Sequence, residues 1–388
     1  MKSKQIMTSL MMILVLSISA AGITQAQATP APQNAGPATI NSATPLVGPD
    51  PDSGGATIDN GVVQIGINNG GHLDRPSDGV GLRPLGGPDA LSPGCFCEGW
   101  GVLAMGAGLG PGLSGFANQA LGTGGIEVDS FASTPSTAVS TVMVPTIAAP
   151  VLKVTHDYHP STSPRLYEVE VTFLNLSGVP IDDVFYRRVM DWDIPPTVFA
   201  EYVTVQGTAT TTKLFASGNN GFMSADQLAS GNNALGGANS DYETGGLGPG
   251  TYFSDFTDLG VSDHGSVFDL KLGPLAVGES KSFKIYYGVA ENEDDAETAL
   301  TVIDAELFSL GQSSTTDGPT LGTPWTFIWA FEGVGGVSQF PVGGEFLPID
   351  NSALLIAGVS ANAVWILPML AGLAGAGIYL TRSKFNWI

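Results

Sequence analysis

Residues 166–174 read LYEVEVTFL, and this stretch decides the fold class. Its aromatic and branched residues alternate with Glu and Thr, so one face is apolar and the other is polar. A period of two residues is typical of a β-strand that buries one face. Residues 184–194 (VFYRRVMDWDI) predict a further strand, and residues 267–272 and 282–289 predict a hairpin-like pair around the turn at Gly278. We therefore predict an all-β protein.

The composition agrees with a large, loop-rich β-sandwich. The chain has 388 residues, of which 52 are Gly and 26 are Pro, while 43% are hydrophobic. This apolar content is enough for a real core, and short apolar runs separated by Gly, Pro, Asn and Asp are typical of strands and turns. We expect a single large antiparallel β-sandwich over residues 57–340, with a Gly-rich and Asn-rich surface loop at 218–250.

One amphipathic helix is predicted near the C-terminal end of the sandwich. Asn292 is a suitable N-cap, and three acids follow it at 293–295, where the helix dipole favours negative charge. Leu and Ile then recur at helical spacing, at 300, 303, 307 and 310, until Gly311 ends the pattern. We interpret these acids as part of the helix start and not as ligands.

Both ends of the chain predict export and tethering. Residues 1–26 combine basic residues, an apolar stretch and a small-residue cleavage site, which is typical of a signal peptide. Residues 353–381 are apolar over a length that spans a bilayer, and the basic tail at 382–388 would stay on the cytoplasmic side. Residues 27–56 and 341–352 are predicted linkers. The expected location is the extracellular face of the cell membrane or the cell surface, with the membrane as a partner through the C-terminal helix.

The charge balance limits the other partners. The chain has 14 Lys and Arg against 36 Asp and Glu, a formal net charge of −22, which excludes nucleic acid because phosphate binding needs clustered cations. Glycans or other surface proteins remain candidate partners. No cofactor is predicted, and calcium is the one candidate ion, because it binds carboxylate oxygens. Residues 50–61 resemble a calcium loop only in part, since Gly54 and Gly61 stand where ligands are needed, so we interpret them as a linker turn.

Residues 187–193 hold the candidate functional side chains of the sandwich. Strand alternation places Arg187, Asp191 and Asp193 on one face, where they could form an Arg–carboxylate network. One interpretation is a structural ion pair at a sheet edge. The other is a sugar site, since paired carboxylates beside an aromatic side chain are used in glycoside chemistry. The candidate acid–base residues are Asp191, Asp193 and Glu98, and the candidate ligand contacts are Trp100, Arg187 and Trp192.

Two further groups could bind a metal or form a covalent bond. Cys95 and Cys97 are predicted to form a disulfide in an oxidising compartment, with a redox or metal role as the alternative. His156, Asp157 and His159 are weak metal candidates. Their stretch is strand-like and followed by Pro, so the two His side chains should lie on opposite faces, and a structural role is the competing interpretation.

Two resemblances bear on the expected function. Residues 94–101 (GCFCEGWG), 155–160 (THDYHP) and 186–194 (YRRVMDWDI) resemble a family of exported, C-terminally anchored prokaryotic surface proteins to which no reaction is assigned. Residues 63–73 (VQIGINNGGHL) and 272–280 (LGPLAVGES) are similar to the opening and closing segments of the galactose-mutarotase-like supersandwich. That resemblance implies a sandwich fold, but the acid–base His and Glu of mutarotases are matched to no position here.

Two functional hypotheses follow, and a third is weaker. The first is a cell-surface-anchored protein with a structural, adhesive or glycan-contacting role and no catalysis. The alternative is a carbohydrate-active enzyme, either mutarotase-like or glycoside-processing, and the third is a metal-binding surface protein. Convergence of Asp191, Asp193, His156 and Glu98 in an open cleft with an exposed aromatic side chain would favour the enzyme. Burial of these groups in mutual hydrogen bonds would disfavour it.

Overall fold

The computed structural model describes residues 54–340, except residues 96, 111, 121, 230–237, 245–246 and 248–249. All of these residues belong to the compact unit Pro45–Ile388. The predicted signal peptide, anchor and tail lie outside the described residues and stay predictions. In the part of the chain that is described, no helix is both long and apolar enough to cross a bilayer.

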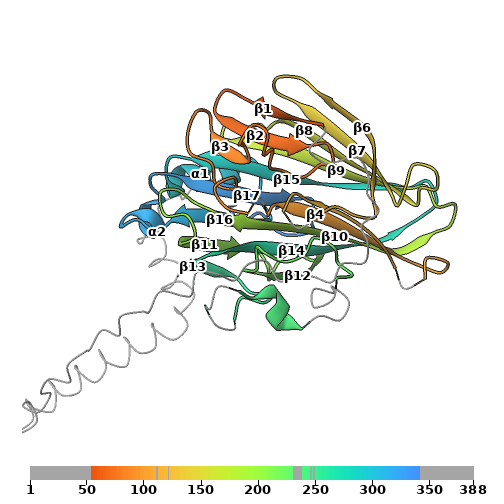
Figure 1. Ribbon diagram of the computed structural model, residues 1–388. Coiled ribbons are helices and arrows are strands. Elements are labelled where there is room, and N and C mark those ends of the chain that lie inside the picture. Colours follow the sequence, from red (N-terminus) through yellow and green to blue (C-terminus); the bar gives the residue numbers. More distant parts are fainter. Residues whose placement is uncertain are drawn as a thin grey trace, which may run out of the picture. The chain divides into compact units, whose positions relative to one another are not determined.

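The architecture is an antiparallel β-sandwich, as predicted (Figure 1). All strand pairings among the described residues are antiparallel. The larger sheet has nine strands, in the order β13 (Phe256–Ser262), β11 (Glu201–Gln206), β16 (Leu307–Ser313), β17 (Thr326–Glu332), β15 (Ser280–Ala290), β9 (Leu166–Asn175), β8 (Leu152–Pro160), β7 (Ala138–Val144) and β6 (Glu127–Ser133).

Two smaller sheets complete the β-structure. A five-stranded sheet runs in the order β12 (Leu214–Gly218), β14 (His264–Leu275), β10 (Ile181–Trp192), β4 (Gly99–Met105) and β5 (Leu113–Asn118). A three-stranded sheet contains β1 (Gly55–Asp59), β2 (Val63–Asn68) and β3 (Leu82–Pro84). Strand β1 therefore begins two residues inside the predicted linker.

The core fills the space between the nine-stranded and five-stranded sheets. On β9, Val169, Val171 and Phe173 are buried while Glu170 is exposed, which is the alternation that residues 166–174 predict. Aromatic rings join the two sheets, for example Phe268 of β14 against Trp329 of β17, with ring centroids 4.9 Å apart. Offset and edge-on aromatic pairs of this kind add to the free energy gained by burying the rings.

Strand β10 is buried on both faces. Its inner face packs in the sandwich core, and its outer face is covered by parts of the segment that follows β12. Buried Met223, Ala225 and Tyr242 of that segment pack against Val189 of β10. Tyr242 closes the short 3₁₀ helix η2 (Asn239–Tyr242). The described part of the predicted surface loop 218–250 is thus partly a cover for the sheet.

The turn at Gly278 does not make the predicted hairpin. Strands β14 and β15 follow each other in sequence but lie in different sheets, because β14 pairs with β10 and β12 while β15 pairs with β9 and β17. The turn carries the chain across the sandwich, which allows both strands to bury an apolar face in one core.

The predicted helix is shorter than its sequence pattern. Helix α1 (Glu293–Val302) starts as predicted, since Asn292 Oδ1 accepts a hydrogen bond from the Asp295 amide at 2.9 Å. The chain then turns at Asp304, and Leu307 and Leu310 lie in β16, which is buried on both faces between the core and α1. A strand buried on both faces is a short apolar run, which periodicity cannot distinguish from the end of a helix.

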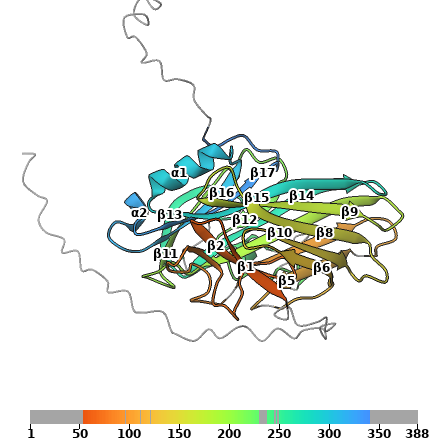
Figure 2. The ribbon, with the colours of Figure 1, turned by 90° about the horizontal axis from the view of Figure 1, so that it is seen from above.

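A second helix, α2 (Gly318–Leu321), is a single turn that the sequence analysis did not predict. Figure 2 shows α1 beside β16 and β17, on the face of the nine-stranded sheet that points away from the five-stranded sheet.

Candidate functional site

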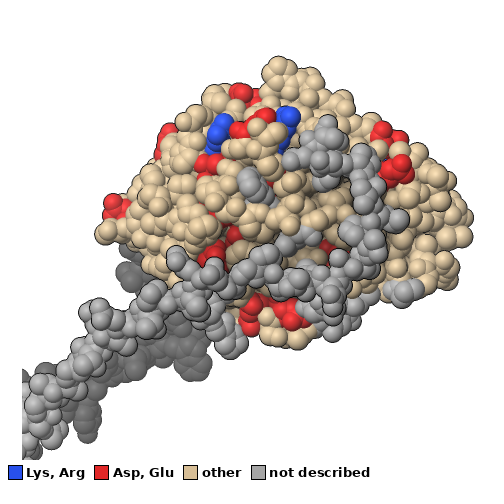
Figure 3. Space-filling model, viewed as in Figure 1, with Lys and Arg blue, Asp and Glu red and all other residues tan. Residues whose placement is uncertain are grey.

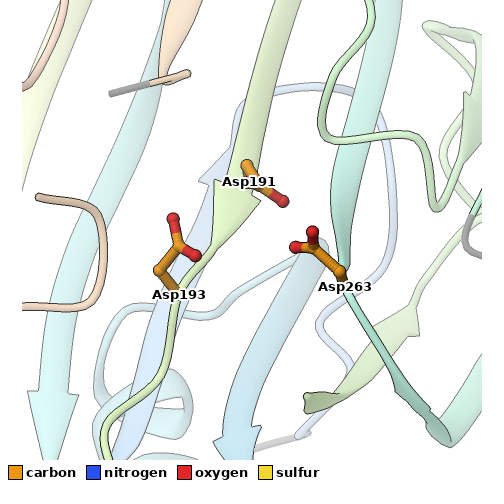
Figure 4. A group of neighbouring side chains, drawn as sticks. All are labelled: Asp191, Asp193 and Asp263. Atoms are coloured by element: carbon orange, nitrogen blue, oxygen red, sulfur yellow. The ribbon is translucent and has the colours of Figure 1, made fainter. Parts of the chain in front are cut away.

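Three carboxylates come together at one end of β10. Asp191 lies in β10, Asp193 follows its last residue, and Asp263 precedes β14 (Figure 4). One oxygen from each of the three lies within 4.8 Å of the other two. The cross-strand pairing of Asp191 with Gly265 brings these segments together, and Gly221 packs its backbone against Asp191 where a Cβ would not fit. We call Asp191, Asp193 and Asp263 the acidic cluster.

The loop at 89–97, in which residue 96 is not described, packs against the acidic cluster through Gly94 and Cys95. Asp89 organises this loop, since its carboxylate accepts hydrogen bonds from the amides of Gly81, Leu91 and Ser92 at 2.8 to 2.9 Å. The Asp193 amide donates to the carbonyl of Ala90 at 2.8 Å, which fixes the loop to the end of β10.

The tip of this loop contacts two members of the cluster. Gly94 lies so close to Asp193 that a Cβ at that position would be 1.7 Å from the Asp193 Oδ2 atom. The predicted disulfide between Cys95 and Cys97 is present, and Sγ of Cys95 lies 3.6 Å from Oδ2 of Asp191. A disulfide sulfur has no hydrogen to donate, so this contact leaves the negative charge of Asp191 uncompensated.

Burial makes the acidic cluster electrostatically unusual. Asp191 and Asp193 are 2% and 1% exposed, and Asp263 is half-buried. Neither oxygen of Asp193, nor Oδ1 of Asp191, has a hydrogen-bond partner of ordinary geometry, although the backbone amides of Cys95 and Trp192 approach Asp193 and Asp191 respectively. Within the described residues, no ion pair joins any of the three to Lys or Arg.

The ionised forms of these carboxylates are therefore disfavoured. Burial, followed by the charge of Asp263, raises the pKa of Asp193 to about 7. Burial also raises the pKa of Asp191 well above its usual range, with further contributions from Asp193, Asp263 and Glu201. Burial raises the pKa of Asp263 as well.

Glu201, at the start of β11, extends the acidic region. It is fully buried, its Oε1 accepts the Ile194 amide at 3.3 Å, and its Oε2 has no hydrogen-bond partner. Burial, with the charges of Asp193 and Asp263, raises the pKa of Glu201 to about 9. Asp193 also interacts electrostatically with Asp89 and with the buried Asp74, and burial together with neighbouring acids raises the pKa of Asp74 well above its usual range.

The predicted network between Arg187 and the two aspartates does not form. Arg187 instead makes a bidentate pair with Asp269 of β14, with Nε to Oδ1 at 2.9 Å and Nη2 to Oδ2 at 2.7 Å. Arg188 points to the opposite face of β10, where its Nε lies 2.5 Å from Oε1 of Glu98. Both arginines therefore form structural ion pairs, but the pairs are fully buried, and β10 lies between β14 and β4 and not at a sheet edge.

The candidate sugar platforms are core residues. Trp100 and Trp192 are both 0% exposed. Trp100 Nε1 donates to the carbonyl of Gly70 at 2.8 Å, and Trp192 Nε1 donates to Ser309 Oγ at 3.2 Å. With no ring face open to solvent, neither side chain can stack on a sugar in this structure. Glu98 is also fully buried, and it is hydrogen-bonded to Arg188 and Tyr287. It is therefore not an acid–base group that is open to a substrate.

The three weak metal candidates of β8 do not converge. His156 points into the core, where its Nε2 lies 3.1 Å from the hydroxyl of Tyr186, while Asp157 and His159 are on the partly exposed opposite face. The opposite-face prediction for the two histidines is therefore confirmed. Burial lowers the pKa of His156 well below its ordinary value, which is consistent with a neutral histidine in the core.

Sequence reasoning missed three residues that complete these sites: Asp263, Glu201 and Asp269. Asp263 and Glu201 each stand alone beside a strand, and Asp269 reads as a polar residue within one. Only the pairing of β10 with β14, and of β11 with β13, where Glu201 lies opposite Ser262, brings them to their partners. These residues could have been found only by predicting which strands are neighbours in each sheet.

Comparisons with known proteins give likenesses in fold only. No protein-family model and no curated protein matches the sequence. Similar solved structures include a galactose mutarotase-like protein from Lactobacillus casei ATCC 334, with 11% identity, 72% of this chain and 87% of that chain covered, and a TM-score of 0.30. A galactose mutarotase related enzyme from Lactobacillus acidophilus is 9% identical, with 72% and 85% covered and a TM-score of 0.25. At these sequence identities and TM-scores, the similar structures support no conclusion about the site.

Proposed function

We propose that this protein is an exported β-sandwich, tethered at the cell surface, that acts through structural or adhesive contacts, glycans included, and not through catalysis. The sequence supports export and tethering through residues 1–26 and 353–381. The observation that carries the non-catalytic part is the burial of the candidate catalytic groups. An acid–base residue has to reach a substrate, whereas Glu98, Asp191 and Asp193 are at most 2% exposed.

The outer surface supports a role in contacts. Four Phe side chains are at least 36% exposed: Phe199, Phe215, Phe222 and Phe253. Three of these four lie on β12 or on the segment between β12 and β13 that covers the five-stranded sheet. Exposed aromatic side chains are enriched where proteins contact partners. The described surface seen in Figure 3 is mostly uncharged and has few cations, which suits neutral partners better than anionic ones.

The test separates surface contact from catalysis on the full-length protein. Protease added to intact producing cells should cleave the protein, since the sandwich is predicted to be outside. Purified protein in chelator should accelerate the mutarotation of aldoses no more than buffer does, as followed by polarimetry. Acceleration that is lost in Asp191→Asn but kept in Asp129→Asn, an exposed aspartate of β6, would overturn the proposal in favour of an enzyme.

A glycan array with the same variants in chelator then examines the contacts themselves. A sugar bound at the outer surface should bind Asp191→Asn as well as the wild-type protein, because Asp191 is buried. Binding lost only in Asp191→Asn would instead place a sugar site at the end of β10.

A further inference from the structure

We infer that the acidic cluster binds one calcium ion, which ties the end of β10 to the start of β14 under the loop at 89–97. The first argument is spacing. Calcium holds its oxygen ligands at about 2.3–2.6 Å, so two ligand oxygens on one ion are at most about 5 Å apart. One oxygen each from Asp191, Asp193 and Asp263 meets this limit, since these three oxygens all lie within 4.8 Å of one another.

The second argument is the state of the buried oxygens. Both oxygens of Asp193, and one oxygen each of Asp191 and Asp263, are buried without a hydrogen-bond partner of ordinary geometry. Buried carboxylates are normally hydrogen-bonded, paired with a cation or bound to a metal. Asp193 is 1% exposed and directed toward the other two carboxylates in Figure 4. No Lys or Arg of the described residues pairs with it, and its one polar neighbour, the Cys95 amide, does not reach ordinary hydrogen-bond geometry.

A neighbouring residue outside the cluster supports the same conclusion. Glu201 is fully buried and keeps Oε2 without a partner, although it faces the charges of Asp193 and Asp263. Beside three other acids, a buried carboxyl group of this kind ionises only where a cation stabilises the charge. The titratable groups that interact electrostatically with the cluster are Asp74 and Asp89 from the N-terminal segment and Glu201 from β11, and His264 follows Asp263 in sequence.

The donor set selects calcium over other divalent ions. All available ligands are oxygens, which suit calcium and magnesium, whereas zinc prefers nitrogen and sulfur. His264 follows Asp263 in sequence, but its ring nitrogens already contact Asn219 at 3.3 Å and the Leu259 carbonyl at 3.1 Å. Cys95 is held in the disulfide. Magnesium demands a compact octahedral shell and retains water, so partly buried carboxylates from separate segments fit calcium better.

The experiment is calcium titration calorimetry on the full-length protein in mild detergent, after removal of metal with chelator. We expect one calcium ion per chain with Kd of about 10⁻⁵–10⁻³ M, the range of weaker sensors and extracellular modules. Calcium should also raise Tm, whereas equal magnesium should raise it much less. No heat of binding and no change in Tm with calcium would overturn the proposal.

Variants locate the ion. Asp193→Asn should weaken calcium binding at least tenfold, and it should fold without metal because it removes a buried charge and keeps the side-chain shape. Asp263→Asn is half-buried and gives a second test should Asp193→Asn fail to fold. Asp129→Asn is the matched control and should bind as the wild-type protein does. Binding that is unchanged in both cluster variants would show that the ion sits elsewhere and would refute this site.

The calcium site goes beyond the proposed surface role, and the two can fail separately. The polarimetry and glycan-array tests are done in chelator, so they do not depend on the ion, and the protease test reports only where the protein is located. The calorimetry does not depend on where the protein is located.

Discussion

At the scale of single residues, the pair between Arg188 and Glu98 shows how a charged group is held in this core. Oε1 of Glu98 accepts from Arg188 Nε and from the Tyr287 hydroxyl at 3.0 Å, and Oε2 accepts the Leu73 amide at 2.6 Å. Arg188 Nη1 donates to the hydroxyl of Tyr186 at 3.0 Å. Each charge thus has an opposite charge and further hydrogen bonds, which help a buried pair to be tolerated, although Nη2 of Arg188 has no hydrogen-bond partner.

Removing one partner of this pair should be strongly destabilising. Glu98→Gln would leave the Arg188 guanidinium buried with no negative charge beside it. We expect the free energy of unfolding to fall by about 3–5 kcal/mol, measured by urea denaturation. Glu170→Gln, an exposed glutamate of β9, is the control and should change it by less than about 1 kcal/mol. An equally small effect of Glu98→Gln would mean that the pair contributes little to the fold.

The residue scale also marks where sequence reasoning stops. Alternation along 184–194 correctly places Arg187 and Arg188 on opposite faces of one strand. It cannot tell which of the 36 acids each arginine meets, because Asp269 and Glu98 are 82 and 90 residues away along the chain. Nor does it reveal that the outer face of β10 is covered, since the covering segment is rich in Gly, Asn and Ser and resembles an exposed loop.

At the scale of elements, strand type was predictable and strand partnership was not. The period-two pattern of β9 and the cap of α1 are local properties, and both are confirmed. The assignment of β14 and β15 to different sheets depends on which neighbours offer the better apolar face, and this is a property of the whole core. For the same reason, the end of α1 was misjudged where the chain enters β16.

The disulfide loop offers a test at this scale. Cys95 and Cys97 close a very short loop, and a cross-link of that length removes little entropy from the unfolded chain. Replacing both residues in Cys95→Ser/Cys97→Ser should therefore lower the free energy of unfolding by only about 1–2 kcal/mol, with the far-UV circular dichroism spectrum unchanged.

Reductant provides the control for that measurement. It should destabilise the wild-type protein by the same amount and leave the double-serine variant unaffected. A loss above about 4 kcal/mol, or a collapse of the β-sheet spectrum, would mean that the loop at 89–97 supports far more of the fold than its contacts with Asp191 and Asp193 suggest.

At the scale of the whole molecule, two sets of buried groups oppose each other as pH changes. Burial, with the charge of Arg188 next, lowers the pKa of His72 to about 3, and burial lowers that of His264 to about 4. A histidine with a lowered pKa stabilises the native state above its unfolded value of about 6.5, and this contribution is lost as pH falls from there toward 3. Protonation of the unfolded chain therefore limits stability on the acid side.

The acids limit stability on the other side, and calcium should remove that limit. The pKa of Asp193 is raised to about 7 and that of Glu201 to about 9, so the metal-free native state holds protons that the unfolded chain has released. The stabilisation of the native state by these retained protons is complete below about pH 4 and is lost as pH rises from 4 to 9. In chelator, Tm should therefore peak on the acid side of neutrality and fall between pH 6 and 8.

With saturating calcium, the peak should move to higher pH, because the ion stabilises the ionised carboxylates and competes with protons for them. The calcium-induced rise in Tm should consequently be larger at pH 8 than at pH 5. Thermal unfolding at the two pH values, with calcium and with chelator, measures this difference, and Asp193→Asn should reduce it while Asp129→Asn should not. A calcium effect that is equal at both pH values would show that the ion does not displace protons from buried acids, and a chelated Tm that rises from pH 6 to 8 would contradict the raised pKa values themselves.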